Sequence, residues 1–176
     1  VKRFADVCGI TPHWRMNKAS PLGHIIYEFA HFEGGINGQE MKSRRLFDEL
    51  VKGKKVVVPC AEMKDLDVVL KLLKERFPEK KFLAIHGKMS EKSKYEAVEM
   101  AQTHIYDAIF FTASMDCGVS IDILGYDLVI CRLNSRSIDA DVTMQMCQRV
   151  RNLKENKIVF VCDSRVKDWD VYPGYN

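Results

Sequence analysis

From residue 54 onward the chain alternates short apolar segments with amphipathic ones, and this rhythm constrains the fold more than any other feature. The apolar segments are rich in valine, isoleucine, leucine and phenylalanine on both faces, and they have the lengths of strands. They cover residues 55–60, 82–86, 108–112, 127–131 and 157–162. Strands that are apolar on both faces are typical of a parallel sheet with helices on either side. The sequence therefore predicts an α/β fold of this kind.

The segments between most of these strands have the spacing of helices with one buried face. The expected helices cover residues 62–76, 91–102 and 139–151, and a further helix is expected at 41–51. Residues 1–32 have no convincing period, and the aromatic tail after residue 168 is expected to be irregular. We therefore divide the chain into residues 1–53, a linker or added helices ahead of the core, and a core domain at 54–176.

Size and composition fit ordinary globular folding. The chain has 176 residues, 47% of them hydrophobic and 29% charged, which suits one domain or at most two small ones. The net charge of +3 does not by itself select a partner. No apolar run approaches the roughly 18 residues of a membrane span, so no membrane association is expected. The chain opens on Val1 and not on Met, which indicates a piece of a longer protein.

The six cysteines favour a reducing, intracellular compartment. They form no CxxC pair, and several lie inside apolar segments where a thiol packs as a small hydrophobic group. We expect them to be reduced, in the cytosol or nucleus. The five histidines form no HExxH or comparable cluster, so no metal site is expected.

Three common glycine motifs of α/β proteins are absent. The sequence has no GxxxxGK(S/T) loop, no GxGxxG after a strand and no GxSxG elbow. These absences weigh against a phosphate-binding loop, a dinucleotide site and the commonest hydrolase nucleophile. If the chain binds nucleotide phosphates, it must bind them with side chains and from one side of the nucleotide only.

The most informative segment is residues 145–152, in the last expected helix. One stripe of that helix carries Gln145, Gln148, Arg149 and Asn152. The opposite arc carries Val142, Met146, Cys147 and Val150, which would pack on the sheet. A guanidinium flanked by amides suits a polyphosphate, because both groups donate hydrogen bonds to phosphate oxygens. A solvated amphipathic helix would have the same periodicity, so that alternative stays open.

Two loops at strand ends offer contacts to phosphate. The first loop begins at a buried strand end, supplies hydroxyl groups from Thr112 and Ser114, and includes Gly118, which allows close backbone approach. The second is His86-Gly87-Lys88, followed by Ser90 as the N-cap of the next helix. An ordinary turn glycine explains the first loop about as well, and for the second loop, taken alone, a capped turn with a surface lysine is the favoured explanation.

The order of these segments is more specific than any one of them. They are a strand into Cys60-Ala61-Glu62, a strand into His86-Gly87-Lys88-Met89, Thr112 through Gly118 to Asp122, and Gln145-x2-Gln148-Arg149-x-Arg151. This order resembles the second RecA-like domain of a superfamily 2 helicase, over about residues 54–163. Within that superfamily, residues 137–152 are similar to the origin-binding-protein helicases of large DNA viruses.

The resemblance implies a RecA-like sheet that shares an ATP site with an N-terminal RecA-like domain outside this chain. In the family, that first domain carries the P-loop and the acids that bind Mg²⁺, so ATP and Mg²⁺ would be bound mainly there. This domain would supply arginine fingers, matched by Arg149 and Arg151, which stabilise charge on the transferred phosphoryl group. The other matching ATP contacts are Gln145, Gln148, Gly118 and Asp122.

The resemblance also implies contacts to the backbone of single-stranded nucleic acid. The matching residues are Thr112, Ser114, His86, Lys88 and Cys60. Such contacts carry no base information, so DNA is preferred to RNA only through the viral resemblance. The expected function is the second motor domain of an ATP-dependent helicase in DNA replication, in the host nucleus or cytoplasm for a viral protein. Alone, the chain is expected to be inactive, because it lacks a P-loop.

Three positions depart from the family pattern. Gln148 stands where glycine is usual, and Cys60 stands where serine or threonine is usual. Arg151 lies two residues after the first arginine, where three is common, and it is off the helical stripe unless the helix ends there. These departures keep open a second hypothesis, a non-catalytic RecA-like module that binds nucleic acid or protein.

Overall fold

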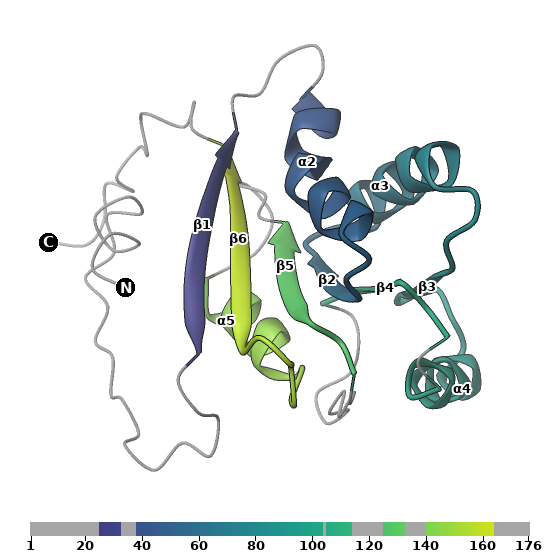
Figure 1. Ribbon diagram of the computed structural model, residues 1–176. Coiled ribbons are helices and arrows are strands. Elements are labelled where there is room, and N and C mark those ends of the chain that lie inside the picture. Colours follow the sequence, from purple (N-terminus) through teal and green to yellow (C-terminus); the bar gives the residue numbers. More distant parts are fainter. Residues whose placement is uncertain (1–24, 33–37, 104, 114–124, 133–139, 164–176) are drawn as a thin grey trace, which may run out of the picture.

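Six parallel strands form the centre of the described molecule. The computed structural model describes residues 25–32, 38–103, 105–113, 125–132 and 140–163 (Figure 1). The strands are β1 (Ile26–Phe32), β2 (Val56–Cys60), β3 (Phe82–Ile85), β4 (Ala108–Thr112), β5 (Leu128–Arg132) and β6 (Lys157–Asp163). They lie in the order β1-β6-β5-β2-β4-β3, and neighbouring strands are parallel throughout. The predicted α/β class with a parallel sheet is confirmed.

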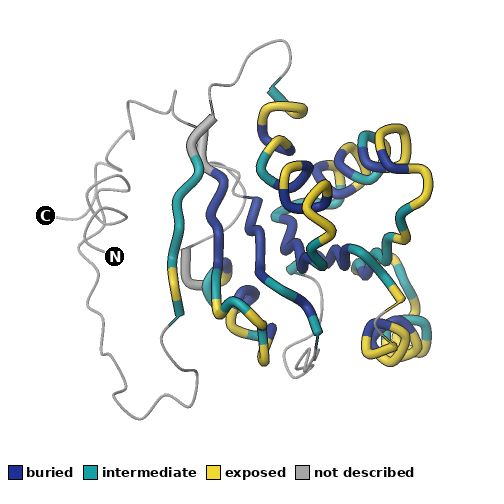
Figure 2. Tube along the Cα trace, viewed as in Figure 1, coloured by how far each residue is buried: buried dark blue, intermediate teal, exposed yellow. Residues whose placement is uncertain are grey.

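Helices cover both faces of this sheet. They are α2 (Gly38–Val51), α3 (Met63–Arg76), α4 (Glu91–Ala101) and α5 (Ala140–Gln148). Helices α2 and α3 pack on the face that carries Val56 and Val58, whereas α4 and α5 pack on the face that carries Val57. Because successive side chains of a strand point to opposite faces, the central strands β2, β4 and β5 contribute to both cores. These three strands are buried along their whole length (Figure 2).

The five strands expected from residue 54 onward are confirmed, with small differences at their ends. Helix α2 begins at Gly38, earlier than expected, and α5 ends at Gln148 instead of continuing to Arg151. The early end of α5 has a local cause. The amide of Arg149 still bonds back to the carbonyl of Gln145, but the amide of Val150 bonds to the carbonyl of Cys147 at 3.3 Å, three residues back, so the α-helical pattern stops there.

Strand β1 was not predicted from the sequence. It pairs with β6, far along the chain, and the rings of Tyr27 and Phe29 stack on Phe160 with centroids 6.2 and 5.4 Å apart. Its periodicity is weak because it is a half-buried edge strand with polar and apolar residues mixed. Strand β1 and helix α2 thus pack with the strands that follow them, and the division of the chain at residue 53 stays a prediction about domain organisation.

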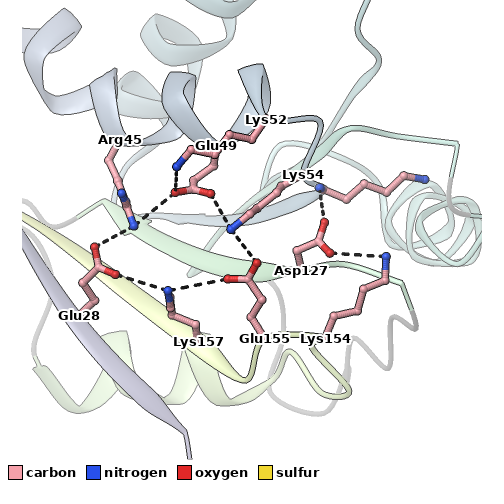
Figure 3. Close-up of polar contacts among 10 residues, drawn as sticks. Glu28, Arg45, Glu49, Lys52, Lys54, Asp127, Lys154, Glu155 and Lys157 are labelled. Atoms are coloured by element: carbon pink, nitrogen blue, oxygen red, sulfur yellow. Dashed lines mark hydrogen bonds and ion pairs between the residues drawn. The ribbon is translucent and has the colours of Figure 1, made fainter.

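At the amino-terminal ends of the strands, a chain of ion pairs joins α2 to the sheet (Figure 3). We call it the amino-edge network; it consists of Glu28, Arg45, Glu49, Lys52, Lys54, Glu155 and Lys157. The carboxylate of Glu49, whose side chain is 1% exposed, lies 3.3 Å from Arg45, 3.1 Å from Lys52 and 2.9 Å from Lys54. Through Glu28, which lies 2.8 Å from Arg45, the network fastens the edge strand β1 to α2.

Candidate functional site

Three neighbouring strands end side by side at the carboxyl edge of the sheet. In register, Cys60 at the end of β2 is the partner of Thr112 in β4 and of Arg132 in β5. Since residues paired in register point the same way, all three side chains belong to the face covered by α2 and α3. In open parallel sheets, ligands bind beyond these carboxyl ends. The structure therefore brings together two residues predicted to contact nucleic acid, Cys60 and Thr112.

The thiol of Cys60 is enclosed by this packing. The residue is 0% exposed, and burial raises the pKa of the thiol, an effect that the nearby charge of Arg132 only partly opposes. Thr112 is 6% exposed. The Cys60 side chain therefore cannot reach a nucleic-acid backbone. Only its main chain, or the residues that follow it, could make such a contact.

The predicted residues after β3 reach the same edge. Ile85 is the register partner of Phe111, so His86 lies level with Thr112. Lys88 is exposed, and His86 is half-buried, with an enclosed Nδ1 that has no hydrogen-bond partner among the described residues. The predicted N-cap is confirmed, because Ser90 Oγ accepts a hydrogen bond from the amide of Ser93 at 3.2 Å.

The end of α5 presents the polar group predicted for ATP. Gln145 and Gln148 are exposed and Arg149 is half-buried, whereas Met146, Cys147 and Val150 are buried against the sheet. The predicted packing face is therefore largely correct. Val142 is the exception: it is 38% exposed, and the buried face of α5 instead runs through Thr143, which is 6% exposed.

Arg149 and Arg151 differ in how they are held. The amide of Arg149 donates to the carbonyls of Gln145 and Met146 at 3.2 and 3.3 Å, so this residue continues the last turn of α5. Arg151 lies beyond the helix and is exposed. The segment then passes the amino-terminal end of β5, where the Lys154 amide donates to the carbonyl of Tyr126 at 3.0 Å.

The two groups of predicted residues therefore lie on different faces of the sheet. The group of Arg149 belongs to the face of α4 and α5, and the group of Cys60 and Thr112 belongs to the face of α2 and α3. Ser114, Gly118 and Asp122, also predicted as site residues, lie outside the described residues. Their assignment stays a prediction.

A buried charge cluster at the carboxyl edge was not predicted. We call it the carboxyl-edge cluster; it consists of Gln39, Lys42, Ser43, Asp65 and Arg132. The Arg132 guanidinium donates to Asp65 through Nε at 2.9 Å and through Nη2 at 3.1 Å. It also donates to Ser43 Oγ at 2.8 Å and to Gln39 Oε1 at 3.2 Å. Lys42 Nζ adds a third contact to Asp65 at 3.0 Å.

The electrostatics of this cluster centre on Asp65. Burial alone would raise the pKa of its carboxyl group, but the hydrogen bonds and charges of Arg132 and Lys42 hold that pKa below its ordinary value. One sequence signal pointed here: Arg132 ends a strand that is apolar on both faces, and a buried guanidinium requires an anionic partner. The partners themselves lie far along the chain and have no local signature.

In the described ranges, no group of three or more His, Cys, Asp or Glu side chains is arranged to hold a metal ion. No helix within those ranges is both long enough and apolar enough to cross a membrane.

Known proteins resemble this chain along most of its length. The family described as "Helicase conserved C-terminal domain" matches residues 41–154. A protein of African swine fever virus named "Putative helicase/primase complex protein" is 25% identical over 164 residues. That match covers 92% of this chain but only 15% of the viral protein, so the chain spans a small part of such relatives.

Solved structures show the same fold. Domain 2 of the DEAD-box helicase Mss116p, bound to an RNA duplex, superposes with a TM-score of 0.62 at 13% identity, over 80% of this chain and 55% of that one. The C-terminal part of the Fun30 ATPase domain superposes with a TM-score of 0.59 at 17% identity, over 73% of this chain and 42% of that one. The expected resemblance to a helicase C-terminal domain with a RecA-like fold is confirmed, and the chain belongs to the helicase conserved C-terminal domain family.

Proposed function

We propose that this domain is the second half of an ATP-dependent DNA helicase motor and that Arg149 is its principal arginine finger. Membership of the helicase C-terminal family supports the motor assignment. The observation that carries the finger assignment is the end of α5, where a half-buried arginine is flanked by the exposed amides of Gln145 and Gln148. All three are hydrogen-bond donors, and this donor set fits phosphate oxygens.

The packing of α5 suits a finger. Cys147 and Val150 are buried on either side of Arg149 in the sequence, and the Arg149 amide is bonded to the last turn of the helix. The guanidinium of Arg149 therefore extends from backbone that is firmly packed at the end of α5. ATP, when bound, supplies the phosphoryl group that is transferred, and a guanidinium held in place stabilises the charge that develops on it. Arg151, outside the helix, is the second and less constrained candidate.

We propose that the remaining parts of the nucleotide site come from an N-terminal RecA-like domain of the same protein. That domain would supply the P-loop and the acids that bind Mg²⁺, and Gly118 and Asp122 would approach the nucleotide from this side. The carboxyl edge, with His86, Lys88 and Thr112, would face the nucleic-acid backbone. Ser114 and the main chain at Cys60 would extend that contact.

The viral helicase/primase relatives support DNA as the substrate and replication as the process. The described free cysteines, Cys60, Cys131 and Cys147, are all buried, which agrees with a reducing compartment such as the host cytoplasm or nucleus.

The test uses the complete protein with Arg149→Ala. We expect ATP turnover to fall by about 10³-fold or more while the fold survives, since a finger acts on the transition state. Arg44→Ala, at an exposed position on α2, is the matched control and should leave turnover unchanged. Normal turnover in Arg149→Ala would refute the finger assignment. The isolated chain should have no ATPase activity. Robust activity of the purified chain would contradict the proposal that the P-loop comes from an N-terminal RecA-like domain.

A second candidate function is a non-catalytic module that binds nucleic acid or protein. The glutamine at position 148 and the shifted Arg151 favour it. A salt-sensitive complex of this chain with single-stranded DNA, combined with no ATP turnover by the complete protein, would support this candidate over the motor.

A further inference from the structure

The carboxyl-edge cluster joins three elements at the place where nucleic acid is proposed to bind. Arg132 ends β5, Asp65 lies in the first turn of α3, and Ser43 lies near the start of α2. The side chains of Arg132, Asp65 and Lys42 are 0%, 5% and 7% exposed. The ends of two helices and one strand are therefore fixed to one another by enclosed hydrogen bonds.

The geometry of the guanidinium makes this connection specific. Its Nε and Nη2 donate to the two oxygens of Asp65, while Nη1 donates to Ser43 on a different helix. A planar group with donors in a fixed fork sets both distance and angle between the elements it joins. A lysine at this position would keep the charge but would lose the fork.

The segment held in this way is the one that follows β2. Cys60 is the register partner of Arg132, and only Ala61 and Glu62 separate it from α3, whose first turn contains Asp65. The pair of Arg132 and Asp65 thus closes a short loop at its far end. Because the Cys60 side chain is enclosed, this loop must present its main chain in the right place if it is to contact a phosphate.

The charge of the cluster has the sign that a phosphate backbone requires. Two cations, Arg132 and Lys42, face a single carboxylate, that of Asp65. Counted over the side chains of the cluster alone, the two cations leave one positive charge that Asp65 does not balance. Being enclosed, this charge is screened by salt less than a surface lysine would be.

We propose that Arg132 is a positioning residue for nucleic-acid binding: through Asp65 and Ser43 it holds the loop from Cys60 to Glu62 against the carboxyl edge. The inference rests on the proposed function. It states that one buried side chain, that of Arg132, fixes the geometry of the nucleic-acid-binding surface at the carboxyl edge. Arg132 touches neither ATP nor the nucleic acid; it acts through the loop.

The experiment measures binding of a single-stranded DNA oligonucleotide and the KM for ATP in the complete protein. Arg132→Met is expected to raise the Kd for DNA by about tenfold, which corresponds to the loss of one well-formed charged hydrogen-bond set, with the KM for ATP unchanged. Arg132→Lys should restore only part of the affinity, because it keeps the charge without the fork. Ser43→Ala, a milder change that preserves the ion pair, should raise the Kd by about twofold to threefold.

The matched control is Glu49→Gln in the amino-edge network. It disturbs an enclosed carboxylate of α2 at the opposite end of the sheet, so it should lower the thermal midpoint while leaving the Kd for DNA unchanged within about twofold. If Arg132→Met fails to fold, Arg132→Lys and Ser43→Ala carry the test.

The outcomes separate this proposal from the proposed function. Wild-type affinity in all folded variants at Arg132 and Ser43 would overturn the positioning role and leave the motor intact. Equal weakening by Glu49→Gln would show that general stability, not position, sets the affinity, and would also overturn it. Full restoration by Arg132→Lys would assign the effect to charge alone and would overturn the positioning role of the guanidinium fork. Absence of DNA binding by the wild-type protein would overturn the proposed function itself, and this inference with it.

Discussion

The two ends of helix α2 are fixed to the sheet by charges in contrasting ways. At both ends a nearly enclosed carboxylate, Asp65 or Glu49, is held by cations that keep its pKa below the ordinary value although burial would raise it. At the amino edge the cations reach solvent, with Lys52 54% exposed and Arg45 27% exposed. At the carboxyl edge Arg132 and Lys42 are enclosed.

The difference indicates two tasks. A network with solvated cations adjusts to its surroundings and is screened by salt, so it suits a fastening between an edge strand and a helix. An enclosed cluster has one geometry and a large penalty for losing it, so it suits a surface whose shape matters. The first lies where β1 joins the sheet, and the second lies where Cys60, Thr112 and Arg132 end together.

The largest effect on stability is expected from Arg132→Met. It removes the main partner of an enclosed carboxylate, so the free energy of unfolding should fall by about 3 kcal/mol, at the lower end of the range because Lys42 still pairs with Asp65. Urea unfolding followed by circular dichroism measures this. A loss below about 1 kcal/mol would place the cluster among ordinary surface pairs.

Glu49→Gln should have a smaller effect. The amide loses the charge that three cations surround, but those cations can turn toward water, so we expect a loss of about 1–2 kcal/mol. The same urea titration measures it. A loss larger than that of Arg132→Met would reverse the comparison.

The free energy of unfolding should fall at acidic pH as Asp65 and Glu49 become protonated. A folded-state pKa below the ordinary values of 3.8 for Asp65 and 4.5 for Glu49 contributes stability above those values, and this stability is lost as the pH falls through the lower folded-state pKa. Unfolding free energies between about pH 6 and pH 2 should therefore decline less steeply in Asp65→Asn than in the wild type. An unchanged slope would contradict the assigned direction of the Asp65 shift.

The smallest effect is expected at the rim of the amino-edge network. Lys157 lies 3.7 Å from Glu28 and 3.8 Å from Glu155 and is partly exposed, so Lys157→Met should cost less than about 1 kcal/mol. That cost should shrink further at high salt. Thermal melts at low and high salt measure it, and a salt-independent loss would show that the network is less solvated than its exposure indicates.

The sequence predicted the alternating strands and helices of this fold better than the long-range contacts that hold them together. The five strands after residue 54 can be predicted from local apolar runs, and their parallel arrangement can be predicted from the apolar residues on both faces. Strand β1 was missed because its stability comes from pairing with β6 and from stacking on Phe160, contacts that no local period reveals.

The candidate site divides in the same way. The exposed positions of Gln145 and Gln148 and the half-buried position of Arg149 follow from helical periodicity and could be predicted. The carboxyl-edge cluster could not, because Arg132 meets Asp65 and Ser43 only when three elements distant in sequence come together. The enclosure of Cys60 depends on the same tertiary packing.

The most direct test of the account is ATP turnover by the complete protein, measured against the concentration of single-stranded DNA. Phosphoryl transfer is proposed for residues at the end of α5, and nucleic-acid positioning is proposed for the carboxyl edge on the other face of the sheet. Arg149→Ala should therefore lack turnover at every DNA concentration, whereas Arg132→Lys should regain wild-type turnover once DNA is raised enough to saturate it. Turnover that DNA restores in Arg149→Ala, or that no DNA concentration restores in a folded Arg132→Lys protein, would contradict this division.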